Sequence, residues 1–87
     1  MASIEEVKAA LAQAAEQGNA TLNQIHAAAG QTEQVLTRLR GVAAGTNHAK
    51  VTEAIQRAHE GKQRLQEAAT LIQNSVTAAR EYISVLG

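Results

Sequence analysis

Cysteine, proline, phenylalanine and tryptophan are all absent from this chain of 87 residues, and tyrosine occurs only once. The absence of cysteine excludes disulfides, thiolate chemistry and cysteine-ligated metals. Because large side chains supply most of the apolar surface that offsets chain entropy, a conventional single-core globule is poorly supported. The absence of proline leaves long helices free to run without a break.

The chain also lacks an excess of charge of either sign and a long apolar run. Eight basic and eight acidic residues cancel, so no net charge attracts the chain to nucleic acid or to an anionic membrane. The start, MASIEEVK, is acidic where a secretory signal would be basic. No apolar run approaches the roughly 18 residues of a membrane span. We therefore expect a cytoplasmic protein with no membrane span. Export by a route that needs no signal peptide remains an alternative.

What the chain does have is alanine, nineteen residues of it, together with Gln, Glu, Lys, Arg and Leu. These are strong helix formers. In the second half, apolar residues recur in alternating steps of four and three, which is the 3.5-residue period of a coiled-coil seam. The one exception is Lys62, which fits a register-setting or snorkelling position. This seam comprises Val51, Ile55, Ala58, Lys62, Leu65, Ala69, Ile72, Val76, Ala79, Ile83 and Leu86.

The first half carries a similar but broader apolar pattern. Ser3 and Glu6 have the spacing of a capping box, which marks the start of a helix. A second stripe, Leu22, Ala29 and Leu36, runs beside the seam, and two adjacent stripes let one helix meet more than one neighbour. The seam itself comprises Ile4, Val7, Leu11, Ala14, Gly18, Thr21, Ile25, Ala28, Thr32, Val35 and Leu39.

The stretch RGVAAGTNHAK, residues 40–50, predicts a turn between the two helices. Gly41 is expected to end the first helix in a left-handed conformation, and Thr46 or Asn47 to cap the second. We predict helices over about 4–40 and 47–85, a turn over 41–46, and one domain over 1–87. Gly18 lies on the seam, where it would allow close backbone approach, and Gly18-Asn19 is the place where the first helix could bend or divide.

The fold class that follows is all-α, an antiparallel two-helix hairpin. Two long rods that touch along one seam bury little surface, so the hairpin is expected to pair into a four-helix bundle with another copy or with a second helical hairpin. The candidate interface residues are Ile4, Val7, Leu11, Ile25, Val35, Leu39, Val51, Ile55, Leu65, Ile72, Val76 and Ile83, with Gly41, Gly45 and Asn47 at the corner.

Residues for chemistry are sparse. His48 and His59 are eleven residues apart, about 16 Å along one helix, which is too far for a shared metal. No serine has a base at a workable spacing. We therefore expect no catalytic residue, metal or cofactor, and a non-enzymatic protein that acts through protein–protein association. The alternative is a nucleic-acid-binding or regulatory module that uses the basic corner of Arg38, Arg40 and Lys50.

The length, the two long helices, the central corner and the Ala/Gln-rich composition resemble the WXG (Esx-type) family of small helical hairpins. The resemblance implies hairpins that pair into four-helix bundles and are exported by type VII secretion systems of actinobacteria and firmicutes. The family carries Trp-x-Gly at the corner, where this chain has Arg40-Gly41-Val42. The family also places an acid four residues after a C-terminal Tyr, where this chain has Leu86 after Tyr82.

Overall fold

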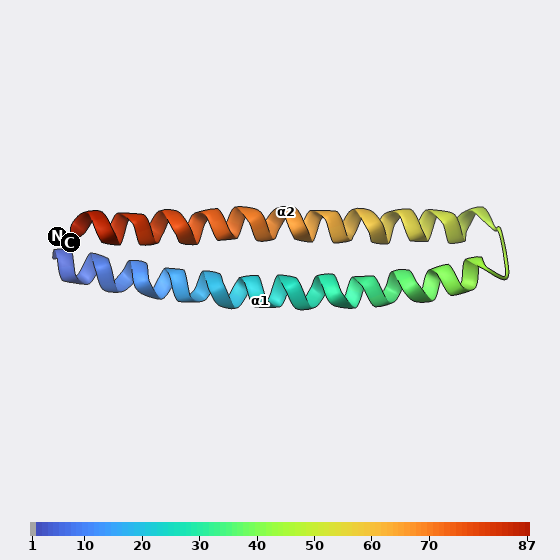
Figure 1. Ribbon diagram of the computed structural model, residues 1–87, viewed down its shortest axis with the longest axis horizontal. Helices are drawn as coiled ribbons and strands as arrows, with labels where there is room; N and C mark the ends of the chain where they lie inside the picture. The colour runs from blue at the N-terminus through green and yellow to red at the C-terminus, as the bar shows by residue number, and fades with distance from the viewer. Residues whose placement is uncertain (1) are drawn as a thin grey trace.

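The computed structural model describes residues 2–87, which form two long antiparallel helices joined by a short turn (Figure 1). Helix α1 spans Ile4–Ala43 and helix α2 spans Ala49–Leu86. The rod that they make measures 63 × 19 × 14 Å, and the two ends of the chain lie together at one end of it. Residues 2–87 contain no strand. The predicted all-α antiparallel hairpin is confirmed.

The start of α1 is fixed by its first residues. The Ser3 side chain accepts a hydrogen bond from the backbone N–H of Glu6 at 3.1 Å, as the Ser-x-x-Glu spacing predicts. Glu5 and Glu6 then lie in the first turn, where negative charge complements the helix dipole.

The turn differs from the prediction at both of its ends. Gly41 lies inside α1 without a positive φ, and the helix continues through Val42 to Ala43. The cause is local. The backbone N–H of Ala44 donates to the carbonyl of Arg40 at 3.1 Å, which closes the last turn in a right-handed conformation. A left-handed glycine is therefore unnecessary at this helix end.

The second helix begins after His48, later than the predicted residue 47. The Nδ1 atom of His48 accepts from the backbone N–H of Lys50 at 3.1 Å, so histidine serves as the cap. The Thr46 hydroxyl instead accepts from the backbone N–H of His48 at 3.3 Å, one step before the helix starts. Gly45 and Asn47 lie exposed in this turn.

The helical conformation of Gly41 gives a test of the corner. Alanine at this position meets nothing within 4 Å, so Gly41→Ala is expected to stabilise the hairpin by about 0.5–1 kcal/mol. Urea denaturation followed by circular dichroism measures this. A left-handed Gly41 would give the opposite result, because alanine there costs about 1–2 kcal/mol.

Helix α2 turns its predicted seam toward α1. All eleven seam positions from Val51 to Leu86 are buried or half-buried, and Val76 is the most deeply buried at 3% exposure. Lys62 is among them. Only Ala54 and Ala68 are half-buried elsewhere on this helix.

Helix α1 uses its second stripe for the contact with α2. Ala15, Leu22 and Leu36 are buried, and Leu36 has no exposed surface. The seam residues Ile4 and Val35 are 57% and 48% exposed. The helix is therefore rotated so that the apolar stripe of Leu22 and Leu36 faces the partner helix, and part of the predicted seam lies at the side of the hairpin.

Among the glycines, Gly18 lies closest to the side chains of the opposite helix. A Cβ atom at this position would overlap Cγ2 of Val76 and lie 3.9 Å from Cγ2 of Ile72. The predicted close approach is thus confirmed. Helix α1 continues unbroken through Gly18 and Asn19, so the first helix is not divided there.

Candidate interaction surface

The hairpin has two long sides. One of them carries charged side chains and the other carries none. Residues seven apart form one stripe along a helix in this packing. On one side, Ala14 of α1 and Ser75 of α2 line a shallow groove next to Gly18 and Val76. Along this side the stripe of α1 is Val7, Ala14, Thr21, Ala28, Val35 and Val42, and the stripe of α2 is Ala54, Gly61, Ala68, Ser75 and Tyr82. None of these eleven residues is charged, and we call them the uncharged side.

The opposite side is polar throughout its length. There His26 of α1 and Gln73 of α2 line one shallow groove, and Arg40 and His59 line another nearer the turn. Nine of the eleven residues on these two stripes are charged, histidine or amide. This polar side comprises Glu5, Ala12, Asn19, His26, Glu33 and Arg40 of α1 with Thr52, His59, Gln66, Gln73 and Arg80 of α2.

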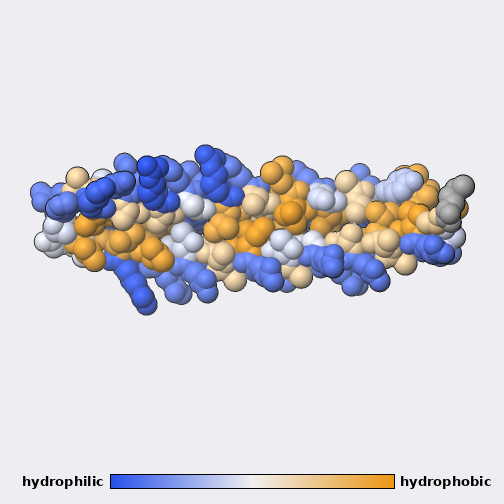
Figure 2. Space-filling model, turned by 180° about the vertical axis from the view of Figure 1, so that it is seen from behind, coloured by the Kyte–Doolittle hydropathy of each residue, from blue (hydrophilic) through white to orange (hydrophobic). Residues whose placement is uncertain are grey.

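Large apolar side chains lie exposed on the uncharged side. Val35, Val42 and Tyr82 are 48%, 53% and 51% exposed. Figure 2 shows this side as a mostly hydrophobic band with pale patches along it, and hydrophilic side chains border much of its length. An exposed and largely apolar band without charged side chains is typical of a surface that binds another protein.

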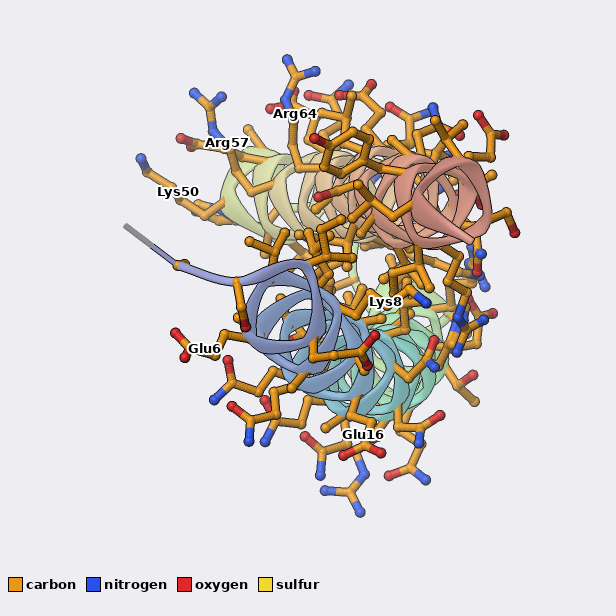
Figure 3. The ribbon with its side chains drawn as sticks, turned by 90° about the vertical axis from the view of Figure 1, so that its left-hand side faces the viewer. Glu6, Lys8, Glu16, Lys50, Arg57 and Arg64 are labelled. Atoms are coloured by element: carbon orange, nitrogen blue, oxygen red, sulfur yellow. The ribbon has the colours of Figure 1, made fainter. Side chains whose placement is uncertain are left out.

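The outer surface of α2 carries a regular row of ion pairs, which we call the rim. Lys50, Arg57 and Arg64, seven residues apart, project from the outer surface of α2 away from α1 (Figure 3). Each pairs with a glutamate three residues later, at 3.0 Å for Lys50–Glu53 and at 3.5 and 3.1 Å for the other two. Such exposed pairs add only about 0.3–0.5 kcal/mol each. Their main effect is to keep this rim solvated.

A single ion-pair cluster joins the two helices in the described part of the chain. Nζ of Lys62 lies 2.7 Å from Oε2 of Glu33, and the guanidinium of Arg40 lies 3.5 Å from Oε1 of the same carboxylate. The hydrogen bond and the charge of Lys62, with a smaller effect of Arg40, hold the pKa of Glu33 below its ordinary value of 4.5. Lys62 thus occupies a seam position with its ammonium group bonded across the hairpin, in agreement with a register-setting role.

This cluster predicts a pH dependence of stability. A carboxylate with a lowered pKa in the folded state stabilises that state above its unfolded pKa, and this contribution is lost as the pH falls through the folded pKa. The contribution of Glu33 begins to decline near its ordinary pKa of 4.5, where the carboxyl group of the unfolded chain takes up a proton, and is gone once the pH lies below the lowered pKa of the folded chain. The free energy of unfolding of wild type should therefore exceed that of Glu33→Gln at pH 7, and the difference should shrink as the pH falls toward 3.

Urea denaturation of both chains from pH 3 to pH 7, at one protein concentration, measures that difference. Glu16→Gln, which removes one exposed carboxylate that takes part in no ion pair among residues 2–87, is the control for the loss of one negative charge. A difference between wild type and Glu33→Gln that stays constant across this range would contradict the assigned role of the carboxylate.

The candidate interface residues from the sequence fall into three groups. Val76 is buried in the hairpin. Ile4 and Val35 are exposed. The others are half-buried, with Val7 on the uncharged side and the rest between the helices: Leu11, Ile25, Leu39, Val51, Ile55, Leu65, Ile72 and Ile83. Val42 and Ala68 also belong to the uncharged side. The sequence pattern alone did not single them out, because this side exists only where the two helices lie next to each other.

The basic corner is largely paired with acids. Of its three residues, Arg40 is paired with Glu33 and Lys50 with Glu53. His48 is engaged in capping α2. Within residues 2–87, no three His, Asp or Glu side chains converge as they would around a metal ion.

Comparisons of the chain with protein-family models, with curated proteins and with solved structures found no match. Neither helix of the described chain combines the length and hydrophobicity that a bilayer crossing requires.

Proposed function

We propose that this chain is a non-enzymatic helical-hairpin protein that functions by associating with other helices through its uncharged side. The observation that carries the proposal is the contrast between the two sides of one rod. Eleven uncharged residues occupy one side, and polar residues occupy the other almost without interruption.

The small core supports the same proposal. Only Ala15, Leu22, Leu36 and Val76 are buried among residues 2–87. Small domains with so little buried apolar surface usually gain stability from oligomerisation, metals or disulfides. Cysteine is absent from this chain. A helical partner on the uncharged side would supply the missing burial.

The particular form of this proposal is a WXG-like hairpin associated with type VII secretion, paired with a copy of itself or with a second hairpin into a four-helix bundle. Its support is the length, the hairpin shape and the Ala/Gln-rich composition. This form also includes export without a signal peptide. Secretion of the intact chain into the medium of a type VII-competent host, and its loss when the secretion ATPase is inactivated, would test it.

A substitution at Val35 tests the association itself. Val35→Glu places a charge on the uncharged side at an exposed position, so the hairpin is expected to stay helical while association is lost. The charge-matched control is Gln66→Glu on the polar side. Light scattering on a dilution series should give wild type and Gln66→Glu masses above the 9.1 kDa of one chain, and Val35→Glu should stay near that value.

If wild type is a monomer in this experiment, its helicity decides the interpretation. A wild-type monomer with low helicity would indicate that the uncharged side requires a different helical chain. A fully helical monomer with cooperative unfolding, unaffected by Val35→Glu, would contradict the proposed function.

A further inference from the structure

We propose that the corner between the two helices is a pH-sensitive element, in which uptake of a proton by His48 releases the first turn of α2, residues 49–52. This element depends on the hairpin alone and acts whether or not the protein is bound to a partner. Three features of the corner carry the proposal: the atom that caps α2, the absence of an acid from the first turn of that helix, and the pairing of the other charged side chains nearby.

The start of α2 is capped by an atom that a proton would occupy. Nδ1 of His48 accepts the hydrogen bond from the backbone N–H of Lys50 at 3.1 Å. The neutral imidazole ring accepts through the free lone pair of one nitrogen, whereas both nitrogens of the imidazolium ion are donors. A proton taken up by His48 therefore occupies the lone pair that holds Lys50. Two N–H groups then point at each other, and the cap is lost.

Of the three histidines, His48 is the one placed to act in this way. Histidine changes charge between about pH 8 and pH 5, whereas the usual cap residues keep their acceptor oxygens over that range. The side chain of His48 is exposed, so protons reach it directly from solvent. His26 and His59 are also exposed, but they lie inside α1 and α2 and cap neither helix. A proton on either of them leaves both helix starts unchanged.

The two helices begin in different electrostatic surroundings. The first turn of α1 contains Glu5 and Glu6, whereas the first turn of α2 contains no acid. The unpaired backbone N–H groups give a helix start about half a positive charge. An imidazolium ion at the start of α2 therefore meets a partial charge of its own sign, and no acid in that turn offsets it. Loss of the cap and repulsion by the helix dipole act in the same direction.

The acids nearest the corner are already paired with bases. Besides His48, the charged side chains in the last two turns of α1, the turn itself and the first two turns of α2 are Arg38, Arg40, Lys50 and Glu53. Glu53 pairs with Lys50 at 3.0 Å, and Glu33, further along α1, pairs with Arg40 at 3.5 Å. A charged His48 thus joins a mainly basic group, so ion pairing does not compensate for the lost cap.

Packing holds the first turn of α2 only weakly. Among residues 49–52, Val51 is half-buried and the other three are exposed. The backbone N–H of Val51 donates to the carbonyl of His48 at 3.0 Å, which is the first bond of the helix to be lost when the turn opens. Release of the turn moves the start of α2 by about one turn and lengthens the connection between the helices. Ala54, the first residue of α2 on the uncharged side, follows directly, so the change reaches the corner end of that side.

His48→Asn tests this element, because asparagine is among the best helix caps and does not titrate. The Cα chemical shifts of residues 49–52, measured by NMR from pH 8 to pH 5, report the helicity of the turn. In wild type the helical shifts should decline as the pH falls, with the ratio of open to helical turn rising about fivefold. In His48→Asn they should stay constant. His59→Asn removes an exposed histidine but leaves the cap, so it should keep the wild-type decline.

Urea denaturation at one protein concentration gives the same comparison for the whole hairpin. The unfolding midpoint of wild type should fall relative to that of His48→Asn as the pH is lowered from 8 to 5, and the titration of every other group is common to both chains. Wild-type shifts that stay as helical as those of His48→Asn would overturn the proposal. A turn that becomes more helical would do the same, because the imidazolium would then stabilise the helix start. A decline that persists in His48→Asn would also overturn it, since its cause would lie in another residue.

Discussion

Gly18→Leu should destabilise the hairpin by about 2–3 kcal/mol, although leucine is the better helix former by nearly 1 kcal/mol. The reason is the close approach of the two helices at this point. Even the first side-chain carbon would overlap Cγ2 of Val76. Val76 is 3% exposed, and a β-branched residue in a helix has essentially one rotamer. The neighbour therefore cannot turn aside, and the helices must separate, with the usual cost of overpacking.

A matched substitution isolates this effect. Gly30 is also inside α1, but a Cβ atom there meets nothing within 4 Å. Gly30→Leu is therefore expected to stabilise the hairpin by somewhat less than 1 kcal/mol, the opposite sign for the same chemical change. Urea denaturation at one fixed protein concentration gives both values, since association would otherwise shift the midpoints.

A second substitution at Val76 tests the contact itself. Val76→Ala alone should cost about 1–2 kcal/mol because it removes buried methyl groups. Combined with Gly18→Leu, it opens the space that leucine needs, so the double variant should be more stable than the sum of the two single effects implies. Strictly additive effects would mean that Gly18 and Val76 do not constrain each other.

The hairpin itself could be predicted because several independent signals agreed. The 3.5-residue period of α2, the Ser3 cap and the absence of proline all indicate long helices, and each depends only on local sequence. The corner was predicted less well. Gly41 can adopt a left-handed conformation but nothing requires it to, and Val42 and Ala43 extend the helix at no conformational cost. His48 was missed as a cap because histidine is seldom the residue that fills this role.

The surface for association could be predicted only in part. On α1 the residues at Val35 and Leu36 are both apolar, and the sequence alone does not say which of them turns toward α2. The rotation of the helix decides this, and it depends on how the larger side chains of both helices fit together. The uncharged side is likewise a property of two helices in one fixed rotation. Its stripe of Ala54, Gly61, Ala68 and Ser75 has little hydrophobic signal until it is placed beside the stripe of α1.

Leu36→Ala is expected to cost about 3–4 kcal/mol in the free energy of unfolding, the largest loss from truncation of any single side chain in the hairpin. Leu36 has no exposed surface, so its removal forfeits a full leucine transfer energy and leaves a cavity. The neighbouring Val35 is 48% exposed. Val35→Ala should therefore change the stability of an isolated hairpin by less than about 1 kcal/mol.

A comparison of Leu36→Ala with Val35→Ala also separates the effect on folding from the effect on association. Loss of Leu36 weakens the contact between α1 and α2, so helicity and unfolding midpoint should fall even at protein concentrations too low for pairing. Loss of Val35 acts on the outer side of the same helix, so its effect should grow with concentration as copies pair. Circular dichroism and light scattering on one dilution series measure both. Equal effects of the two substitutions at every concentration would contradict the rotation of α1, because a helix with both residues equally buried would have no free side to offer a partner.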